Sequence, residues 1–502
     1  MSYVAVMTER IGQWINGHLV TSDAATTSPV FNPATGEQTG ALEFATPAEI
    51  DDAVRSATEA AREWRLSSLS KRSAVLFAFR QILHDRSDEL AAIITAEHGK
   101  VLADAHGEIA RGLENVEYAC GVPELLKGGF SEQAASGVDV YSIRQPLGVV
   151  AGITPFNFPA MVPLWMCANA IAAGNAFVLK PSEKDPSASL WLAKAWQEAG
   201  LPDGVFTVIQ GGKDAVDALL AHESIAAISF VGSTPIAKYI YETGTAAGKR
   251  VQALGGAKNH ALVLPDADLG VAADAIVSAA YGAAGERCMA LSVAVAVGDV
   301  ADKLVDAIAT RLPKLVVGDG TKPGTDMGPL ITAEHRDKVA GYIDAGEESG
   351  ATVVVDGRTG DLPEGGFFLG TTLLDNVTTQ MSVYTDEIFG PVLDVVRVDT
   401  YEEGLALINA NPFANGTAIF TRDGGAARQF QFDVEVGMVG INVPIPVPVA
   451  YYSFGGWKAS LFGDTHMYGP EGINFYTRGK VVTSRWPDPA TSSVDLGFPR
   501  TR

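Results

Sequence analysis

The sequence predicts an α/β protein with more than one domain, and three observations lead to this class. The chain has 502 residues, more than the roughly 100–200 residues of a usual single domain. Its first quarter is dominated by helical periodicity. From about residue 148, short apolar runs alternate with helical stretches, which is typical of a parallel sheet covered by helices on both faces.

The clearest helical pattern spans residues 46–64. It opens with Thr46, Pro47 and Glu49 in capping-box order, and its apolar residues then recur at helical spacing. Similar patterns predict a helix over 70–98, which ends at Gly99 in the position of a C-terminal cap, and another over 102–118.

Six short apolar runs predict strands: GVVAGIT from 148, AFVLK from 176, VFTVI from 205, AAISFVG from 226, RVQAL from 250 and HALVLP from 260. With the helical stretches between them, the first of these runs predict a nucleotide-binding α/β domain. A second α/β pattern runs from about 254 to 470. Within it, the Pro-rich stretch VPIPVPVAYYSFGG is interpreted as a rigid loop rather than a polyproline ligand.

Composition and charge exclude several classes of partner. Apolar residues make up 47% and charged residues 19%, a globular balance, and no apolar run is long enough to cross a bilayer, so we expect no membrane partner. The formal net charge of −22 would repel phosphate backbones, so we expect no nucleic acid. The opening residues lack the features of a signal or transit peptide, which predicts a cytoplasmic protein.

The chain has three cysteines, too few and too widely spaced for a disulfide framework or a zinc cluster, and no metal site is expected. Cys120 and Cys167 lie in apolar helical patterns and are predicted to be small buried hydrophobes. Cys288, in AAGERCMALS, differs from them because it follows Arg287 in a run of small residues that would let a ligand come close.

The usual phosphate-binding fingerprints, G-x-G-x-x-G and the P-loop, are missing. Instead, Lys180 stands at the end of the strand AFVLK with Glu183 just after it, and Gly232 and Ser233 follow the strand AAISFV at the start of a helix. Strand ends and helix N-termini are where α/β sheets bind dinucleotides. Taken singly, Ser233 would be an ordinary N-cap and Lys180 with Glu183 a solvated pair.

Seven motifs occur in the order and spacing of the aldehyde dehydrogenase superfamily: GITPFNFPAMVPLW, LKPSE, FVGST, LGG, GERC, EIFGPV and FGGWK. The stretches QALGGAKNHALVLPDAD, AAGERCMALS and HGKVLADAHGEIARGLENVEYACG resemble its methylmalonate-semialdehyde dehydrogenase branch, which makes acyl-CoA products. This resemblance implies an NAD-binding domain over 1–130 and 146–253, and a catalytic domain over 254–470. It also implies a small β arm over 131–145 and 471–502 that would build a dimer or a tetramer.

The resemblance also implies roles for individual residues. Cys288 matches the nucleophile, with the charge of Arg287 expected to favour its thiolate, and Asn157 matches the donor to the oxyanion. Arg111 and Arg287 match a clamp for a substrate carboxylate. Without the family, Arg111 would be a helix-surface residue pairing with Glu108 and Glu114. The implied cofactor-binding residues are Thr154, Phe156, Lys180, Glu183, Gly232, Ser233, Glu387 and Phe389.

One expected residue is missing. Hydrolytic members carry a glutamate at the start of the LGG motif, where this chain has Ala253 preceded by Gln252, and the neighbouring Leu254 is no better as a base. Glu286 is an alternative carboxylate, but a charge so close to Cys288 would oppose thiolate formation. The missing base favours deacylation by a thiol such as coenzyme A.

Together these features predict NAD-dependent oxidation of malonate or methylmalonate semialdehyde, with loss of CO2 and transfer of the acyl group to coenzyme A. Glu183 favours NAD over NADP, because a carboxylate beside the adenosine ribose would repel a 2′-phosphate. Two alternatives stay open: a hydrolytic aldehyde dehydrogenase that releases a free acid, and a non-catalytic binding protein on the same scaffold.

Overall fold

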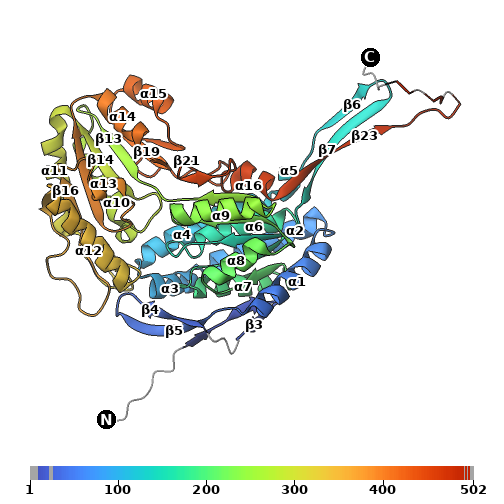
Figure 1. The fold of residues 1–502 in the computed structure, drawn as a ribbon, viewed down its shortest axis with the longest axis horizontal. Coiled ribbons are helices and arrows are strands. Elements are labelled where there is room, and N and C mark those ends of the chain that lie inside the picture. The colour runs from blue at the N-terminus through green and yellow to red at the C-terminus, as the bar shows by residue number, and fades with distance from the viewer. Residues whose placement is uncertain (1–8, 22–25, 491, 495, 498–502) are drawn as a thin grey trace, which may run out of the picture.

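The computed structural model describes residues 9–21, 26–490, 492–494 and 496–497. Two large sheets, each with helices packed against it, form the body, and a narrow three-stranded sheet projects from it (Figure 1). The first eight residues, where we expected no signal peptide, lie outside the described residues, as does the end of the predicted arm.

The N-terminal helices follow the predicted pattern with one difference. Helix α1 (Pro47–Trp64) begins with the predicted capping box, in which Thr46 and Glu49 exchange side-chain and backbone hydrogen bonds. The single helix expected over 70–98 is two helices, α2 (Leu69–Asp85) and α3 (Ser87–His98), because Arg86 between them leaves helical geometry at φ −116°. Gly99 caps α3 in the left-handed region, and α4 (Leu102–Cys120) and the short α5 (Val122–Leu125) follow.

The first large sheet contains five of the six predicted strands in parallel, in the spatial order β12-β11-β8-β9-β10. Antiparallel strands extend it at both edges, β22 beside β12 and β2 with β3 beside β10. The strand bounds are β2 Gln13–Ile15, β3 His18–Val20, β8 Val149–Ile153, β9 Ala176–Lys180, β10 Phe206–Val208, β11 Ile225–Val231, β12 Arg250–Leu254 and β22 Leu461–Phe462. Strand β22 lies far along the chain, within 254–470.

Both faces of this sheet are buried, as the continuous apolar runs predict. Along β9, Phe177 and Leu179 join one apolar cluster, while Ala176 and Val178 join the other. The first cluster contains residues of α2, α3, α4, α6 and α7, and the second contains residues of α1, α8 and α9. These further helices are α6 Met161–Ala172, α7 Ser187–Glu198, α8 Lys213–Ala221 and α9 Thr234–Ala246.

The second sheet has the order β15-β16-β17-β14-β13-β19-β20 and is parallel except for β15. Its strands are β13 Asn259–Val263, β14 Leu291–Val297, β15 Thr352–Val355, β16 Thr372–Asp375, β17 Val392–Val398, β19 Gly416–Phe420 and β20 Met438–Ile441. The helices around it are α10 Leu269–Tyr281, α11 Ala301–Ala309, α12 Ala333–Glu348, α13 Ser382–Thr385, α14 Tyr401–Ala410 and α15 Gly424–Asp433. A third apolar cluster fills this layer.

Three small sheets complete the described chain. The projecting sheet has the order β23-β7-β6, with strands β6 Phe130–Ala135, β7 Val138–Pro146 and β23 Thr477–Arg485, and α16 Gly469–Phe475 precedes it (Figure 1). Strands β1 Glu9–Ile11, β4 Thr27–Asn32 and β5 Glu37–Glu43 form another, and β18 Phe413–Ala414 pairs with β21 Trp457–Lys458. Single 3-10 turns cover Gly282–Gly285, Gly298–Val300 and Leu312–Lys314.

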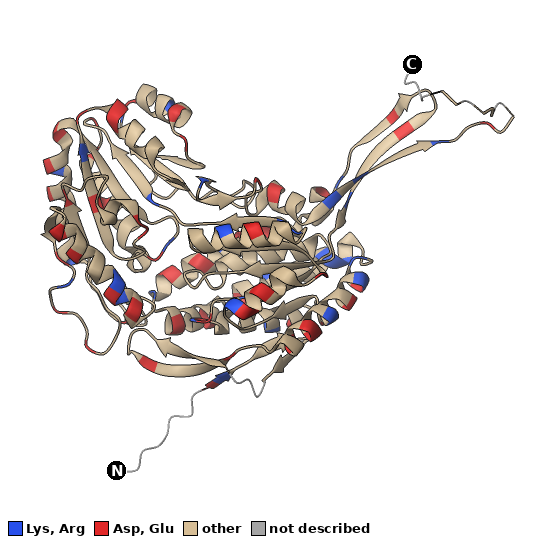
Figure 2. Cartoon of the chain, in the orientation of Figure 1, with Lys and Arg blue, Asp and Glu red and all other residues tan. Residues whose placement is uncertain are grey.

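Acidic residues are spread over the helices of both layers, with Lys and Arg among them (Figure 2). Among the described residues, no helix is both long enough and apolar enough to cross a membrane.

Candidate active site

The parallel order of the first sheet brings the predicted strand-end residues to one edge. Strands β11, β8 and β9 are neighbours, so the residues that follow them meet at their carboxyl ends. Six predicted residues line one cavity of about 570 Å³ there: Thr154, Phe156, Lys180, Glu183, Gly232 and Ser233.

The donors and acceptors of this strand-end cavity suit a dinucleotide. Lys180 Nζ lies 3.2 Å from a Glu183 carboxylate oxygen, and the two side chains can together bond ribose hydroxyls. Burial opposes ionisation of Glu183, but the Lys180 ammonium and backbone N–H groups leave its pKa below the usual value. Ser233 is the N-cap of α9, yet its side chain makes no capping hydrogen bond. The first-turn N–H groups of α9 are therefore available to an anion.

Cys288 lies in the loop between α10 and β14, at the amino edge of the second sheet. Its carbonyl oxygen accepts hydrogen bonds from the side chains of Asn259 (3.0 Å) and Asn415 (3.2 Å), which hold the backbone in place. The preceding residues Ala283, Ala284 and Gly285 all have positive φ, at 50°, 54° and 76°. Such backbone strain is typical of functional loops, where surrounding contacts hold it in place.

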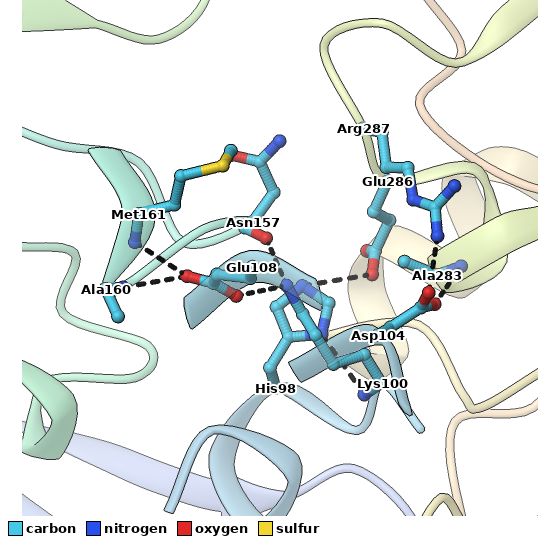
Figure 3. Close-up of polar contacts among 10 residues, drawn as sticks. All are labelled: His98, Lys100, Asp104, Glu108, Asn157, Ala160, Met161, Ala283, Glu286 and Arg287. Atoms are coloured by element: carbon cyan, nitrogen blue, oxygen red, sulfur yellow. Dashed lines mark hydrogen bonds and ion pairs between the residues drawn. The ribbon is translucent and has the colours of Figure 1, made fainter. Parts of the chain in front are cut away.

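The thiol of Cys288 does not have the environment that we expected. Burial, and after it the negative charge of Glu387, raises its pKa to about 12. Arg287 acts in the opposite direction but has the smallest effect of the groups involved. Its guanidinium is paired with Asp104, at 2.6 Å (Figure 3). Arg287 therefore favours the thiolate, as expected, but burial and Glu387 outweigh it in the unliganded protein.

The other two cysteines agree with the prediction that they are small buried hydrophobes. Cys120 and Cys167 are buried, and all three cysteines are free. Burial raises the pKa of Cys120 to about 11 and that of Cys167 to about 12. Unlike Cys288, neither of them lines any of the cavities described here.

Both predicted arginines reach the same cavity as Cys288. This cysteine cavity has a volume of about 380 Å³ and is lined by Arg111, Arg287, Cys288, Lys100, Asp104, Gly107, Glu108, Phe158, Met161, Trp165, Ala283, Met289, Ile445, Val447 and Phe454. Arg111 pairs with Glu114 at 2.7 Å, as the surface interpretation predicted, but its expected pairing with Glu108 is wrong, because that carboxylate is occupied elsewhere.

The Pro-rich stretch forms one wall of the cysteine cavity through Ile445 and Val447. The carbonyl oxygen of Pro448 accepts hydrogen bonds from Arg111 Nη2 (2.7 Å) and from the Tyr468 hydroxyl (2.9 Å). The interpretation as a loop fits this placement, but the alternation of Val and Pro gave no sign of a role in shaping the site.

The loop of Asn157 is held by a buried ion pair that the sequence did not reveal (Figure 3). Lys100 Nζ lies 2.8 Å from a Glu108 carboxylate oxygen and 2.5 Å from the carbonyl oxygen of Asn157, and both charged side chains are fully buried. The other oxygen of Glu108 accepts the backbone N–H groups of Ala160 (2.8 Å) and Met161 (3.0 Å). Asn157 thus lies on a backbone fixed at both ends, next to the cavity-lining Phe158.

Glu387 and Phe389 connect the cysteine to the strand-end cavity. Both line a narrow pocket with Cys288, and the rings of Phe389 and Phe156 meet edge to face at 5.8 Å. Glu387 accepts the backbone N–H of Ala257 at 2.8 Å, and burial raises its pKa to about 7. The predicted cofactor residues are therefore continuous with the nucleophile.

The three residues considered as a base at the LGG motif, 252–254, are buried in the packing of the first sheet. The buried Gln252 side chain bonds the Ser229 hydroxyl at 2.7 Å and two backbone carbonyls, and Ala253 and Leu254 are buried apolar residues. None of the three can accept a proton near neutral pH.

The carboxylate of Glu286 lies against Ile331 and His98. One carboxylate oxygen accepts the N–H of Ile331 at 3.2 Å, and the other lies 4.0 Å from His98 Nε2 (Figure 3). Its burial is complete and raises its pKa to about 8. The carboxylate that raises the pKa of Cys288 is Glu387, so the expected opposition by Glu286 was wrong.

A family model described as the aldehyde dehydrogenase family matches residues 19–482. The chain belongs to the aldehyde dehydrogenase family. The resemblance inferred from the seven motifs and the predicted α/β fold are thereby confirmed.

Relatives of this aldehyde dehydrogenase cover almost its whole length. It is 56% identical over 489 residues to malonate-semialdehyde dehydrogenase of Pseudomonas aeruginosa, covering 97% of this chain and 98% of the relative. A crystal structure of putative methylmalonate-semialdehyde dehydrogenase from Sinorhizobium meliloti, complexed with NAD, is similar with a TM-score of 0.95 at 51% identity, covering 97% of this chain and all of that one. The structure of methylmalonate-semialdehyde dehydrogenase from Oceanimonas doudoroffii also gives a TM-score of 0.95, at 56% identity, covering 96% and 99%.

Proposed function

We propose that this aldehyde dehydrogenase oxidises malonate or methylmalonate semialdehyde with NAD, releases CO2 and transfers the acetyl or propionyl group to coenzyme A. The names of its relatives support this substrate class. The observation that carries the proposal is the presence of two arginines, Arg111 and Arg287, in one cavity with Cys288. Guanidinium groups suit a carboxylate, which both semialdehydes carry one carbon away from the reacting carbonyl.

In the proposed reaction, Cys288 loses its thiol proton to solvent, and the thiolate attacks the aldehyde carbon and forms a thiohemiacetal oxyanion. The side chain of Asn157 and the backbone N–H of Cys288 donate hydrogen bonds to that oxygen; losing one such donor typically slows catalysis about 10²–10³-fold. Loss of hydride from the same carbon leaves a thioester on Cys288. Arg111 and Arg287 hold the substrate carboxylate until the bond to it breaks and it leaves as CO2, and a proton from water then replaces it on the carbon next to the thioester.

The strand-end cavity is the proposed site of NAD, which supplies the hydride acceptor when bound. Lys180 and Glu183 would bond the adenosine ribose, and the N-terminus of α9 at Ser233 would bind the pyrophosphate. Glu387 would bond the second ribose, and Phe389 would pack against the nicotinamide. The complex of the S. meliloti relative with NAD supports this cofactor.

The thioester is released by the thiol of coenzyme A, whose attack returns Cys288 as the leaving thiolate. The buried, non-titrating side chains at 252–254 support this step over hydrolysis, because water needs a general base more than a thiol does. The hydrolytic alternative would need a base outside that segment.

The test is NADH formation from methylmalonate semialdehyde with and without coenzyme A, beside propanal, which lacks the carboxylate. Sustained turnover that requires coenzyme A, with poor use of propanal, is expected. Equal turnover without coenzyme A would overturn the acyl-transfer proposal in favour of hydrolysis. Failure both to bind NAD and to react at Cys288 would instead favour the non-catalytic alternative.

The projecting sheet is proposed to be the oligomerisation arm. Its outer strands, β6 and β23, each leave one edge unpaired within the described sheet, and such edges are suited to pairing with another subunit. Sedimentation of the full chain would distinguish the expected dimer or tetramer from a monomer. The cytoplasmic location stays a prediction that cell fractionation can test.

A further inference from the structure

Asp104 holds two parts of the cysteine cavity with one carboxylate (Figure 3). Its Oδ1 accepts a hydrogen bond from Arg287 Nη2 at 2.6 Å, and its Oδ2 accepts the backbone N–H of Ala283 at 3.0 Å. Ala283 begins the run of left-handed residues that leads to Cys288. A single side chain of α4 therefore fixes both the guanidinium and the strained loop beside the nucleophile.

Gly282 provides the space in which this guanidinium lies. A Cβ at position 282 would come within 2.4–2.6 Å of three guanidinium atoms of Arg287, closer than real Cβ contacts. The backbone of Gly282, at φ −56° and ψ 137°, is open to any residue. Glycine at this position therefore leaves space for Arg287, and a larger side chain would push the guanidinium aside.

The pair of Arg287 and Asp104 also forms a boundary between two cavities. Both residues line the cysteine cavity and a second cavity of about 580 Å³, whose other lining residues include Asp274 and Arg311. The two side chains are only 20% and 24% exposed, so water screens their attraction less than at an open surface. Without its partner, the long arginine side chain could turn into either cavity.

The fixed guanidinium keeps donors for a ligand. A guanidinium carries five N–H donors in a planar fork, and Asp104 takes a hydrogen bond from only one of its nitrogens. The remaining donors can form the paired hydrogen bonds that a carboxylate prefers. How well they do so depends on the angle and depth at which the fork is held, because a displacement of about 1 Å can cost roughly 10²-fold in rate.

We propose that Asp104 and Gly282 determine the selectivity for carboxylated aldehydes, by holding the Arg287 guanidinium where it meets the substrate carboxylate. Asp104 is a positioning residue, since it acts through Arg287 and forms no bond to the substrate. The inference rests on the proposed function, which supplies a carboxylated substrate.

Two variants perturb Arg287 in independent ways. Asp104→Ala removes its partner and the loop contact, whereas Gly282→Ala keeps every charge and displaces only the guanidinium, the movable end of a flexible side chain. The matched control is Asp274→Ala, which removes the carboxylate of another Asp–Arg pair on the second cavity, with Arg311 at 2.5 Å.

The readout is the ratio of kcat/KM for methylmalonate semialdehyde to kcat/KM for propanal, both measured with NAD and coenzyme A. In Asp104→Ala and Gly282→Ala we expect this ratio to fall by about tenfold or more, a change of about 1.4 kcal/mol in selective transition-state binding. Most of the change should be a higher KM for the semialdehyde. Asp274→Ala should keep the wild-type ratio.

Each other outcome contradicts the proposal. An unchanged ratio in Gly282→Ala would mean that the placement of Arg287 does not govern selectivity. Equal losses of kcat/KM for both aldehydes would mean that Asp104 and Gly282 act only on the loop that carries Cys288. A higher ratio would mean that Asp104 competes with the substrate carboxylate for Arg287. A wild-type enzyme with no preference for the semialdehyde would overturn the proposed function itself, before any variant is compared.

Discussion

The ammonium of Lys100 lies 2.5 Å from the carbonyl oxygen of Asn157 and 2.8 Å from the carboxylate of Glu108, with both charged side chains fully buried. Breaking such a pair leaves one charge unpaired away from water, which typically costs about 3–5 kcal/mol. Lys100→Met should therefore lower the free energy of unfolding by roughly that amount, as measured by urea denaturation.

The cost of Lys100→Met should be partly reversed by adding Glu108→Gln. This second change removes the unpaired charge but keeps an oxygen that can accept the N–H groups of Ala160 and Met161. Strictly additive losses in the double variant would contradict the ion-pair account. The double variant should still show a lower kcat than the wild type, because the Asn157 carbonyl has lost its donor.

The raised pKa of Cys288 predicts slow alkylation of the unliganded enzyme near neutral pH. Since only the thiolate reacts and its pKa is about 12, the rate with iodoacetamide should rise with each pH unit from 7 to 10 without reaching a plateau. Glu387→Gln removes the carboxylate that contributes to this shift, so it should speed alkylation at every pH in this range. Labelled peptides identified by mass spectrometry, with Cys288→Ala as the control, provide the measurement. A plateau below pH 8 would contradict the prediction.

Sequence reasoning predicted the parts of the site that depend on local order. Lys180 ends one strand, Glu183 lies three residues after it, and Gly232 and Ser233 follow another strand, so recognising parallel neighbours was enough to bring them together. Asp104 and Arg287 are 183 residues apart in the chain, and no periodicity relates them. Their contact depends on how α4 packs beneath the loop that precedes β14.

The same limit applies to the pKa of Cys288. Adjacency in sequence indicated correctly that Arg287 favours a thiolate, but it could not reveal burial or Glu387, which have larger and opposite effects. The structure also pairs the Arg287 guanidinium with Asp104, which is distant in the chain. Helical patterning likewise could not locate the break at Arg86, because the apolar pattern continues through it.

Glu286 should make stability depend on pH. Burial raises its pKa in the folded protein to about 8, whereas an exposed glutamate titrates near about 4.3. Between these values the unfolded chain binds fewer protons at this group than the folded one, so the contribution of Glu286 to stability falls as pH rises from about 4 to 8. Glu286→Gln cannot ionise and should raise Tm relative to the wild type, with a difference that widens from pH 5 to pH 8. A pH-independent difference would contradict a buried, protonated Glu286.

Glu183 should decide between NAD and NADP. Its carboxylate is held ionised by Lys180, at 3.2 Å, in the cavity where the adenosine ribose is proposed to bind, so it would repel a 2′-phosphate. Glu183→Gln removes the charge and keeps the shape, and we expect the ratio of kcat/KM for NAD to kcat/KM for NADP to fall by about tenfold or more, equivalent to about 1.4 kcal/mol. The control is Glu242→Gln, on the exposed surface of α9 beside Lys238, which should leave the ratio unchanged. If both variants keep the wild-type ratio, the carboxylate of Glu183 does not select the cofactor; if both lower it equally, the effect comes from net charge and not from the position of Glu183.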